Sequence, residues 1–237
     1  MRAALPVRRI EADPLAVAPP DVWPATLPAV RQVLTDGLEL GPVTVITGEN
    51  GSGKSTLVEA LAIAYGLNAE GGSTGAQHAS RPSESSLGEH LRVVRGAGAS
   101  KKGFFLRAET MHAFYSYLER SEFPERLHER SHGESFLDLV SDRWRLRGLW
   151  LLDEPEAALS LSGCLALVAL LREQVAAGSQ VVVSTHSPVI AAFPGADLIE
   201  VGEWGLRSCD YDDLDLVRGW RGFLAAPERY VGGDGDA

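Results

Sequence analysis

Short apolar runs rich in β-branched residues alternate along the chain with longer segments whose apolar residues have helical spacing. The short runs predict buried strands and the longer segments predict helices. The expected strands are Val43–Thr47, Leu91–Val94, Phe104–Leu106, Leu149–Leu152, Gln180–Ser184 and Asp197–Val201. The expected helices run from Lys54 to near Gly66, over Glu109–Glu119, from Phe136 to near Arg147, over Leu159–Val175 and over Asp210–Leu224. This alternation indicates an α/β fold with a largely parallel sheet covered by helices on both faces.

The chain of 237 residues is expected to form a single domain. Residues 1–42 hold seven prolines, which predicts short edge strands and turns, and therefore a small N-terminal β portion. Residues 67–103 are rich in Gly and Ser and predict a flexible loop. The tail 231–237 is expected to fray.

Composition limits the function classes. The formal net charge of -10 argues against a protein that coats nucleic acid by charge alone, although it leaves room for a local basic face. No apolar run approaches the roughly 20 residues that span a bilayer. The two cysteines have no metal-site or disulfide-framework spacing and suit a reducing compartment. We therefore expect a soluble, cytoplasmic protein with no transmembrane segment of its own.

The segment VTVITGENGSGKSTL, residues 43–57, combines a buried strand, a glycine turn and the start of a helix. Its spacing fits the pattern G-x-x-x-x-G-K-[ST], in which backbone N–H groups surround a phosphate chain and the helix dipole points at it. Lys54 would reach the β- and γ-phosphates, and the Ser55 hydroxyl would bind Mg²⁺. The alternative is a glycine-rich turn that precedes a helix by chance. The nucleotide-binding candidates are Gly48, Glu49, Asn50, Gly51, Ser52, Gly53, Lys54, Ser55 and Thr56.

Two carboxylates, Asp153 and Glu154, end the apolar run LWLL. In phosphate-loop enzymes an acidic residue at such a strand end holds Mg²⁺, and a second one can polarise the attacking water. Adjacent side chains of an extended segment point in different directions, so each could serve one role. The alternative is a helix N-cap with an acidic first turn. Because the phosphate loop lies upstream, we favour Asp153 as a metal ligand and Glu154 as a catalytic residue.

His186 follows the strand QVVVS, at the sheet edge where phosphate loops lie in open α/β sheets. A lone histidine is usually structural, but here it could contact the γ-phosphate or the attacking water. The segment SHGES, residues 131–135, opens an expected helix and could form a second anion site, or simply a capped helix start. A second such site makes sense if it completes the nucleotide site of another copy of the chain.

Together these motifs resemble those of ABC-type ATPases over about residues 40 to 200, which implies the P-loop NTPase fold. GENGSGKST resembles the Walker A motif, LWLLDEPE resembles Walker B with its catalytic glutamate, and STHSP resembles the switch-histidine loop. SHGE, with Ser131, Gly133 and Glu134, resembles the signature motif usually written LSGGQ, although Arg130 replaces the usual leucine, His132 the first glycine and Glu134 the glutamine. The details are similar to soluble ABC-type ATPases of the AAA-family kind, which are related to the heads of chromosome-maintenance, recombination and repair proteins.

The sequence departs from this family pattern at two places. The family's lid glutamine has only Gln77 as a counterpart between Walker A and the signature, and Glu109 is the other candidate for that position. The segment after Walker B, residues 157–160, lacks the usual aspartate. Communication between the two sites of a dimer is therefore expected to differ from the family pattern.

The resemblance implies hydrolysis of ATP with Mg²⁺ in a head-to-tail homodimer that acts as a conformational switch, with DNA maintenance or repair as the context. Lys54, Glu154 and His186 would be catalytic, Ser55 and Asp153 would bind the metal, and the signature would act in trans. The alternatives are the nucleotide-binding subunit of an ABC transporter and an ATP-binding switch with little turnover. DNA is a candidate partner. Trp23, upstream of the loop, is either an adenine-stacking residue or a packing residue.

Overall fold

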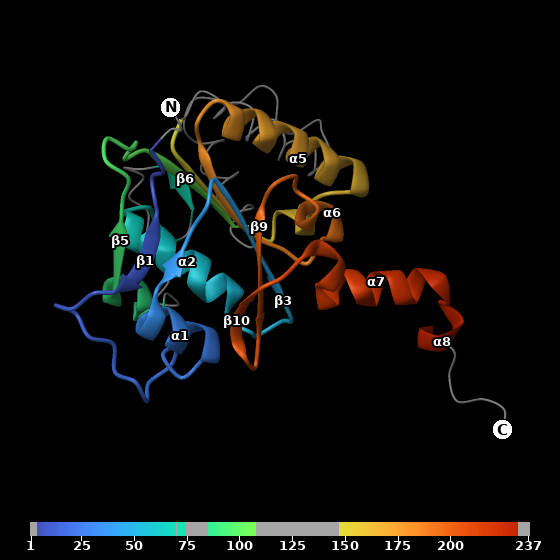
Figure 1. Ribbon diagram of the computed structural model, residues 1–237, viewed down its shortest axis with the longest axis horizontal. Coiled ribbons are helices and arrows are strands. Elements are labelled where there is room, and N and C mark those ends of the chain that lie inside the picture. The colour runs from blue at the N-terminus through green and yellow to red at the C-terminus, as the bar shows by residue number, and fades with distance from the viewer. Residues whose placement is uncertain (1–3, 70, 74–84, 108–146, 232–237) are drawn as a thin grey trace, which may run out of the picture.

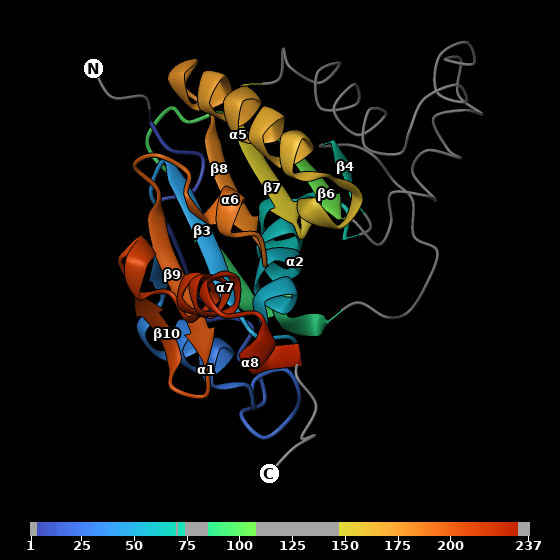
Figure 2. The ribbon, with the colours of Figure 1, turned by 90° about the vertical axis from the view of Figure 1, so that its right-hand side faces the viewer.

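The computed structural model describes residues 4–69, 71–73, 85–107 and 147–231. Figure 1 shows this part of the chain as a twisted central sheet with helices on its two faces and a smaller sheet at one side. Figure 2, a view turned by 90°, looks onto the face of the central sheet that α5 (Leu161–Ala176) covers. Helix α2 (Lys54–Tyr65) packs in the core on the other face. The architecture is α/β, as the sequence predicts.

The central sheet has seven strands in the order β10-β9-β3-β8-β7-β6-β4. The pairs β9–β3, β3–β8, β8–β7 and β7–β6 are parallel, and only the two edge pairs are antiparallel. The strand bounds are β3 Val43–Gly48, β4 Gly72–Ser73, β6 Gly103–Arg107, β7 Leu149–Asp153, β8 Gln180–Ser184, β9 Asp197–Gly202 and β10 Gly205–Ser208. Phosphate-loop strand β3 is therefore central, and β7 with its carboxylates lies two strands away, beyond β8.

Side chains of the central strands alternate between two cores, as the period of a strand requires. Leu149 and Leu151 of β7 join the core under α2 (Lys54–Tyr65), while Trp150 and Leu152 join the core under α5 (Leu161–Ala176). All four side chains are fully buried. A strand that is covered on both faces has no polar positions, which explains why the sequence shows a continuous apolar run here.

A second, three-stranded antiparallel sheet has the order β2-β1-β5. It is built from β1 Arg9–Ala12, β2 Leu38–Glu39 and β5 Leu91–Val94. The expected N-terminal β portion is thus present, but residues 1–42 also contain a helix, α1 Pro28–Asp36, that the proline count conceals. Pro28 lies in the first turn, where its missing N–H costs nothing, and Val30 and Val33 are buried.

Two further segments differ from the sequence-based expectation. Within 67–103, the described residues include the expected strand β5, but also β4 and η1 (Ser86–His90), which the loop-like composition of that stretch conceals. The expected helix over 210–224 begins later: a single turn η3 (Tyr211–Asp213) precedes α7 Asp215–Ala225, and α8 Glu228–Val231 follows. The expected helices over 109–119 and from 136 to 147 lie almost wholly outside the described residues. The remaining elements are η2 Pro155–Ala158 and α6 Pro188–Ala191.

The fully buried Gln180 side chain fastens the N-terminal segment to the start of β8. Its amide oxygen accepts the Val7 N–H at 2.8 Å, and its amide nitrogen donates to the carbonyls of Val7 at 2.6 Å and Gly41 at 2.8 Å. All these polar atoms are thereby satisfied inside the protein. Among the described residues, no helix has the length and apolar character needed to cross a bilayer.

Candidate functional site

The loop between β3 and α2 has the backbone of an anion cradle. Gly48, Gly51 and Gly53 have φ values of 140°, 78° and 104°, which side chains rarely allow. A Cβ at Gly48 would lie 2.2 Å from the carbonyl oxygen of Val201 on the adjacent strand β9, whereas one at Gly51 would meet no atom within 4 Å. Gly53 is the N-cap of α2, so the first free N–H groups of that helix point into the loop.

Lys54 is only 3% exposed at the first position of α2. Its ammonium donates to the Glu49 carbonyl at 2.8 Å, which folds the side chain back over the loop. Burial lowers the pKa of Lys54, and the carboxylates of Glu154, Asp153 and Glu156 oppose this shift. A buried cation that faces nearby carboxylates and a ring of N–H groups is suited to hold a phosphate chain together with a metal.

The C-terminal ends of β7 and β8 bring the predicted carboxylates to the same edge of the sheet. Asp153 and Ser184 are register partners in the β7–β8 ladder, and the Ser184 hydroxyl donates to the Asp153 carboxylate. Asp153 is 5% exposed. The Glu154 N–H donates to the Ser184 carbonyl at 3.0 Å, so the two strands stay paired beyond the end of the ladder.

Glu154 is the one non-glycine residue with positive φ in the described part of the chain, at φ 50° and ψ 49°. This left-handed conformation costs about 1–2 kcal/mol for an ordinary residue. It turns the Glu154 side chain out of the strand direction, so that its carboxylate lies 3.4 Å from Nε2 of His186. The Glu154 side chain is 38% exposed and His186 is 33% exposed, so both can meet a ligand from solvent.

The His186 loop is held from two sides. The Thr185 N–H donates to the Ile46 carbonyl of β3 at 3.0 Å, and the His186 N–H donates to the Glu156 carboxylate. These contacts fix the histidine between the phosphate loop and the segment after β7. The structure therefore brings together residues 48–56, Asp153, Glu154 and His186 at one sheet edge, as the sequence predicts for these segments.

A partly buried arginine that no sequence motif signals joins this edge. Arg107 ends β6, and its guanidinium lies 2.7 Å from the carboxylate of Glu59 on α2 and 3.5 Å from that of Asp153. Glu59 also accepts the Ser85 N–H at 3.1 Å. The three ion-pair partners are separated by 46 to 94 positions, a range over which no local pattern can signal a contact.

Several buried polar atoms around the loop lack a hydrogen-bond partner in the described structure. They are the hydroxyls of Thr47 and Ser52, one carboxylate oxygen of Glu156 and Nε2 of His186. Buried polar groups are normally paired, so this concentration marks a place that a polar ligand fits. No described cluster of three or more acidic, His or Cys side chains forms a ready metal cage.

The signature candidates Ser131, Gly133 and Glu134 lie outside the described residues, as do Gln77 and Glu109. The segment after Glu154 forms the single turn η2. A cavity of about 620 Å³ opens beside the phosphate loop, lined by Gly48–Ser52 and His186 and, on its far wall, by residues of the β9–β10 hairpin and the start of α7.

The parallel sheet, the glycine loop and the buried lysine define a P-loop nucleotide-binding protein. A family model described as an AAA domain matches residues 35–105. The chain is 30% identical over 174 residues to the cytochrome c biogenesis ATP-binding export protein CcmA of Nitrobacter winogradskyi, covering 64% of this chain and 81% of that protein. It is 29% identical to CcmA of Rhizobium meliloti over 69% of this chain and 86% of that protein.

The chain therefore belongs to the ABC-type P-loop ATPases. Among solved structures, the SMC head domain from Thermotoga maritima aligns with a TM-score of 0.45 and 15% identity, over 73% of this chain and 93% of that one.

Proposed function

We propose that this chain binds ATP with Mg²⁺ on residues 48–56 and hydrolyses its terminal phosphate bond. The observation that carries the proposal is the buried Lys54 at the start of α2, close enough to Asp153 and Glu154 for their charges to oppose its desolvation. A lysine buried at this position gains its counter-charge from a bound phosphate chain. Membership of the ABC-type ATPases supports the same activity.

The described residues fit the nucleotide and its metal in named roles. The N–H groups of Gly48–Thr56 and the Lys54 ammonium would hold the phosphates, and the unpaired Ser52 hydroxyl would gain a partner. Ser55 and Asp153 would bind Mg²⁺, with Asp153 already oriented by the Ser184 hydroxyl. The metal would supply charge neutralisation on the phosphate oxygens.

Glu154 would take up the proton of the attacking water, and His186 would hold the terminal phosphate. Their side chains are 3.4 Å apart, so both lie in the same part of the proposed site. The left-handed backbone of Glu154 is the strained feature that aims its carboxylate away from the strand. The Glu156 carboxylate, which accepts the His186 N–H, keeps the histidine loop in place.

Two copies would act head-to-tail, with Ser131, Gly133 and Glu134 of the second copy completing each site. ATP binding would close this homodimer and hydrolysis would open it, which makes the cycle a conformational switch. DNA maintenance or repair is the context we favour, with DNA as a partner through phosphate contacts. The exposed position of Glu154 and His186 supports completion of the site by a second chain.

A second candidate function is that of the ATP-binding subunit of an exporter. Both CcmA proteins are named ATP-binding export proteins, and the alignments with this chain cover 81% and 86% of their lengths. Such a subunit would need a separate membrane partner. Co-purification with a membrane protein, together with turnover that rises only in its presence, would favour this candidate over the DNA-linked one.

The test is steady-state ATP hydrolysis with Mg²⁺ by the wild type and Glu154→Gln, with and without duplex DNA, combined with size-exclusion chromatography. We expect turnover that Glu154→Gln lowers by at least about 100-fold, as loss of a general base does. The variant should still bind ATP and run as a dimer with ATP but as a monomer without it. Glu173→Gln, on the outer helix α5, is the matched control and should behave like the wild type.

Each other result has a definite meaning. ATP binding without turnover in the wild type would replace the hydrolase with an ATP-binding switch. A Glu154→Gln protein that stays monomeric with ATP would contradict the head-to-tail dimer. Turnover that ignores DNA would remove the support for a DNA partner and direct the search to a membrane subunit.

A further inference from the structure

Three neighbouring strands of the central sheet end in a row of polar residues. Arg107 is the last residue of β6, Asp153 is the last of β7 and Ser184 is the last of β8. Arg107 is the register partner of Asp153 in the β6–β7 ladder, and Ser184 is its register partner in the β7–β8 ladder. Asp153 therefore has a hydrogen-bonding side chain on each side, along the sheet edge that carries the phosphate loop.

These two neighbours contact the two oxygens of the Asp153 carboxylate separately. The Ser184 hydroxyl donates to Oδ1, and Nε of the Arg107 guanidinium lies 3.5 Å from Oδ2. The Asp153 side chain is 6% exposed, so water has little access to either oxygen. A buried carboxylate that is contacted at both oxygens does not rotate freely, so the protein sets its orientation before any ligand binds.

The Arg107 guanidinium is itself held by a second carboxylate, which comes from helix α2. Nη1 of Arg107 lies 2.7 Å from Oε2 of Glu59, and the other oxygen of Glu59 accepts the Ser85 N–H at 3.1 Å. The Glu59 side chain is 8% exposed. Because Glu59 is closer to the guanidinium than Asp153 is, it balances more of the positive charge. Asp153 therefore keeps negative charge that a cation can bind.

Helix α2 connects this ion pair to the phosphate loop. Glu59 follows Ser55 by four residues, about one turn, so the two side chains lie on the same face of the helix. Ser55 and Asp153 are the residues that we assign to Mg²⁺, and they belong to α2 and to β7. The contacts from Glu59 through Arg107 to Asp153 form a polar bridge between these two elements.

We propose that Arg107 and Glu59 are positioning residues, which set the orientation of Asp153 and its distance from Ser55 so that the two together bind the metal of Mg-ATP. Neither Arg107 nor Glu59 would touch the metal or the nucleotide. This inference rests on the proposed function, because it concerns the metal of the same site. The Ser184 contact fixes Asp153 relative to β8, whereas the bridge fixes it relative to the helix that begins at the phosphate loop.

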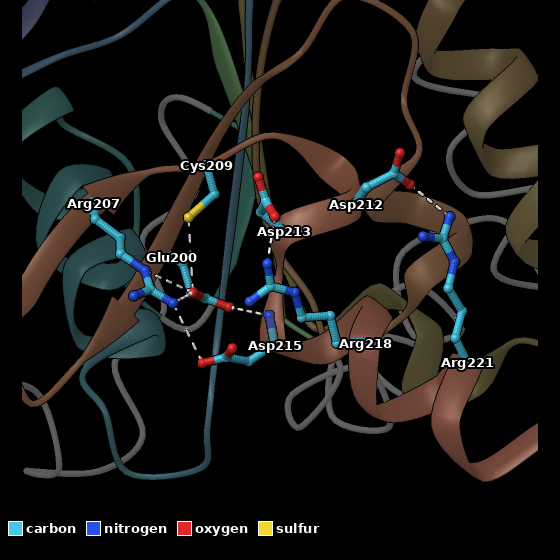
Figure 3. Close-up of polar contacts among 8 residues, drawn as sticks. All are labelled: Glu200, Arg207, Cys209, Asp212, Asp213, Asp215, Arg218 and Arg221. Atoms are coloured by element: carbon cyan, nitrogen blue, oxygen red, sulfur yellow. Dashed lines mark hydrogen bonds and ion pairs between the residues drawn. The ribbon is translucent and has the colours of Figure 1, made fainter.

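Another buried carboxylate with an arginine partner, shown in Figure 3, provides a contrast. Glu200 of β9 is 2% exposed, and it accepts hydrogen bonds from the Arg207 guanidinium at 2.9 Å and from the Asp215 N–H at 2.7 Å. These contacts tie the β9–β10 hairpin to the start of α7. They reach no residue that we assign to the metal, and this distinguishes them from the contacts of Arg107.

The experiment measures the dissociation constant of adenylyl imidodiphosphate by calorimetry, once with Mg²⁺ and once with EDTA. The ratio of the two constants reports how strongly the metal supports nucleotide binding, whatever the catalytic rate. The test variant is the double substitution Glu59→Gln/Arg107→Met. It removes one charge of each sign, so the net charge of the site is unchanged, and glutamine retains an acceptor for the Ser85 N–H.

We expect Mg²⁺ to tighten binding in the wild type, and the double variant to lose about tenfold of that effect, as loss of the outer contacts of a metal ligand does. The constant measured with EDTA should stay within about twofold of the wild type. Asp153→Asn sets the scale, because it removes the ligand charge itself. The matched control is Asp213→Asn/Arg218→Met, which should change neither constant. This ion pair, also drawn in Figure 3, joins η3 to α7, and its side chains are 60% and 59% exposed.

Arg107→Lys is a milder variant that decides the question if the double variant does not fold. Lysine keeps the positive charge, but its ammonium lacks the planar fork that contacts two carboxylates at once. The ratio of the two constants should fall by about threefold, and the constant with EDTA should again stay close to that of the wild type. A ratio equal to that of the wild type would overturn the inference.

The outcomes separate this inference from the proposed function. If the wild type does not bind the analogue, nucleotide binding itself is refuted. If it binds but Mg²⁺ has no effect, or if Asp153→Asn keeps the full effect, the metal assignment of Asp153 is wrong and the inference falls with it. If the double variant and Arg107→Lys keep the wild-type ratio, the bridge only stabilises the fold and the proposed function stands. Equal weakening with Mg²⁺ and with EDTA would contradict the inference as well, because the bridge would then support the loop and not the metal.

Discussion

Removal of the Arg107 guanidinium is expected to destabilise the protein more than removal of an arginine from an exposed ion pair. The Arg107 side chain is 17% exposed, and the carboxylates it contacts at Glu59 and Asp153 belong to side chains that are 8% and 6% exposed. Breaking a buried ion pair by deleting one partner costs about 3–5 kcal/mol, because the other charge stays buried without compensation. Arg107→Met keeps much of the volume, so we expect a loss of about 3 kcal/mol of unfolding free energy.

The assay is urea unfolding of the nucleotide-free protein, followed by circular dichroism, with the denaturant dependence compared between variants. Arg92→Met is the matched control, because Arg92 also pairs with a glutamate, Glu11, but their side chains are 55% and 24% exposed. Exposed pairs contribute less than about 1 kcal/mol, so this variant should unfold close to the wild type. If Arg107→Met costs no more than Arg92→Met, the reasoning from burial is refuted. A second substitution, Glu59→Met, should recover part of the loss, since an apolar pair can replace a buried ion pair.

Three further outcomes are expected from the site and the hairpin. Lys54→Met should abolish the stabilisation of the protein by Mg-ATP. Without ligand, the variant should melt no lower than the wild type, because burial disfavours the charged form of Lys54 and so lowers its pKa. The pKa of Lys54 in the folded protein is below the ordinary 10.5, so between the folded-state and unfolded-state pKa values the unfolded chain binds more protons. The stability of the wild type relative to Lys54→Met should therefore rise as the pH increases toward 10.5, which thermal melts can measure. Glu154→Gly should raise the unfolding free energy by about 1 kcal/mol, because glycine adopts the left-handed backbone without strain, and it should abolish turnover. A melting temperature below that of the wild type would contradict the inference that the Glu154 backbone is strained. Burial, followed by the Glu200 carboxylate, raises the pKa of Cys209, so at pH 8 iodoacetamide should alkylate it more slowly than free cysteine, with Glu200→Gln increasing the rate measured by peptide mass spectrometry.

The central sheet and the nucleotide edge were predictable because each depends on local sequence. The run over 43–47 and the glycines after it specify a strand and a turn within a few residues, and the structure places that strand at Val43–Gly48. Strands that are covered on both faces have continuous apolar runs, so the sequence predicts β7 and β8 in the same way. The ends of parallel strands share one edge, which is why Asp153 and His186 could be expected near the loop.

The features that the sequence analysis missed depend on contacts between distant residues or on weak local signals. The Arg107–Glu59 pair joins β6 to α2 across 48 positions. The local signal for hairpin β9–β10 is weak: Gly202-Glu203-Trp204-Gly205 is a two-residue turn between glycines. The many prolines of residues 1–42 hide helix α1, although a proline in the first turn is a helix start signal. The cavity beside Trp204 needs the hairpin and the start of α1 in place together.

The position of β3 also has a consequence for how the protein is made. Its only sheet neighbours among the described strands are β8 and β9, which lie roughly 150 residues later in the chain. At a synthesis rate of roughly 5–20 residues per second, β3 waits on the order of ten seconds or more on the ribosome before either neighbour exists. During that time VTVI is an unpaired apolar strand, the kind of segment that aggregates or recruits chaperones. A nascent chain that stops before Gln180 should therefore expose β3 and form no nucleotide loop, so the ability to bind a nucleotide arises late and all at once.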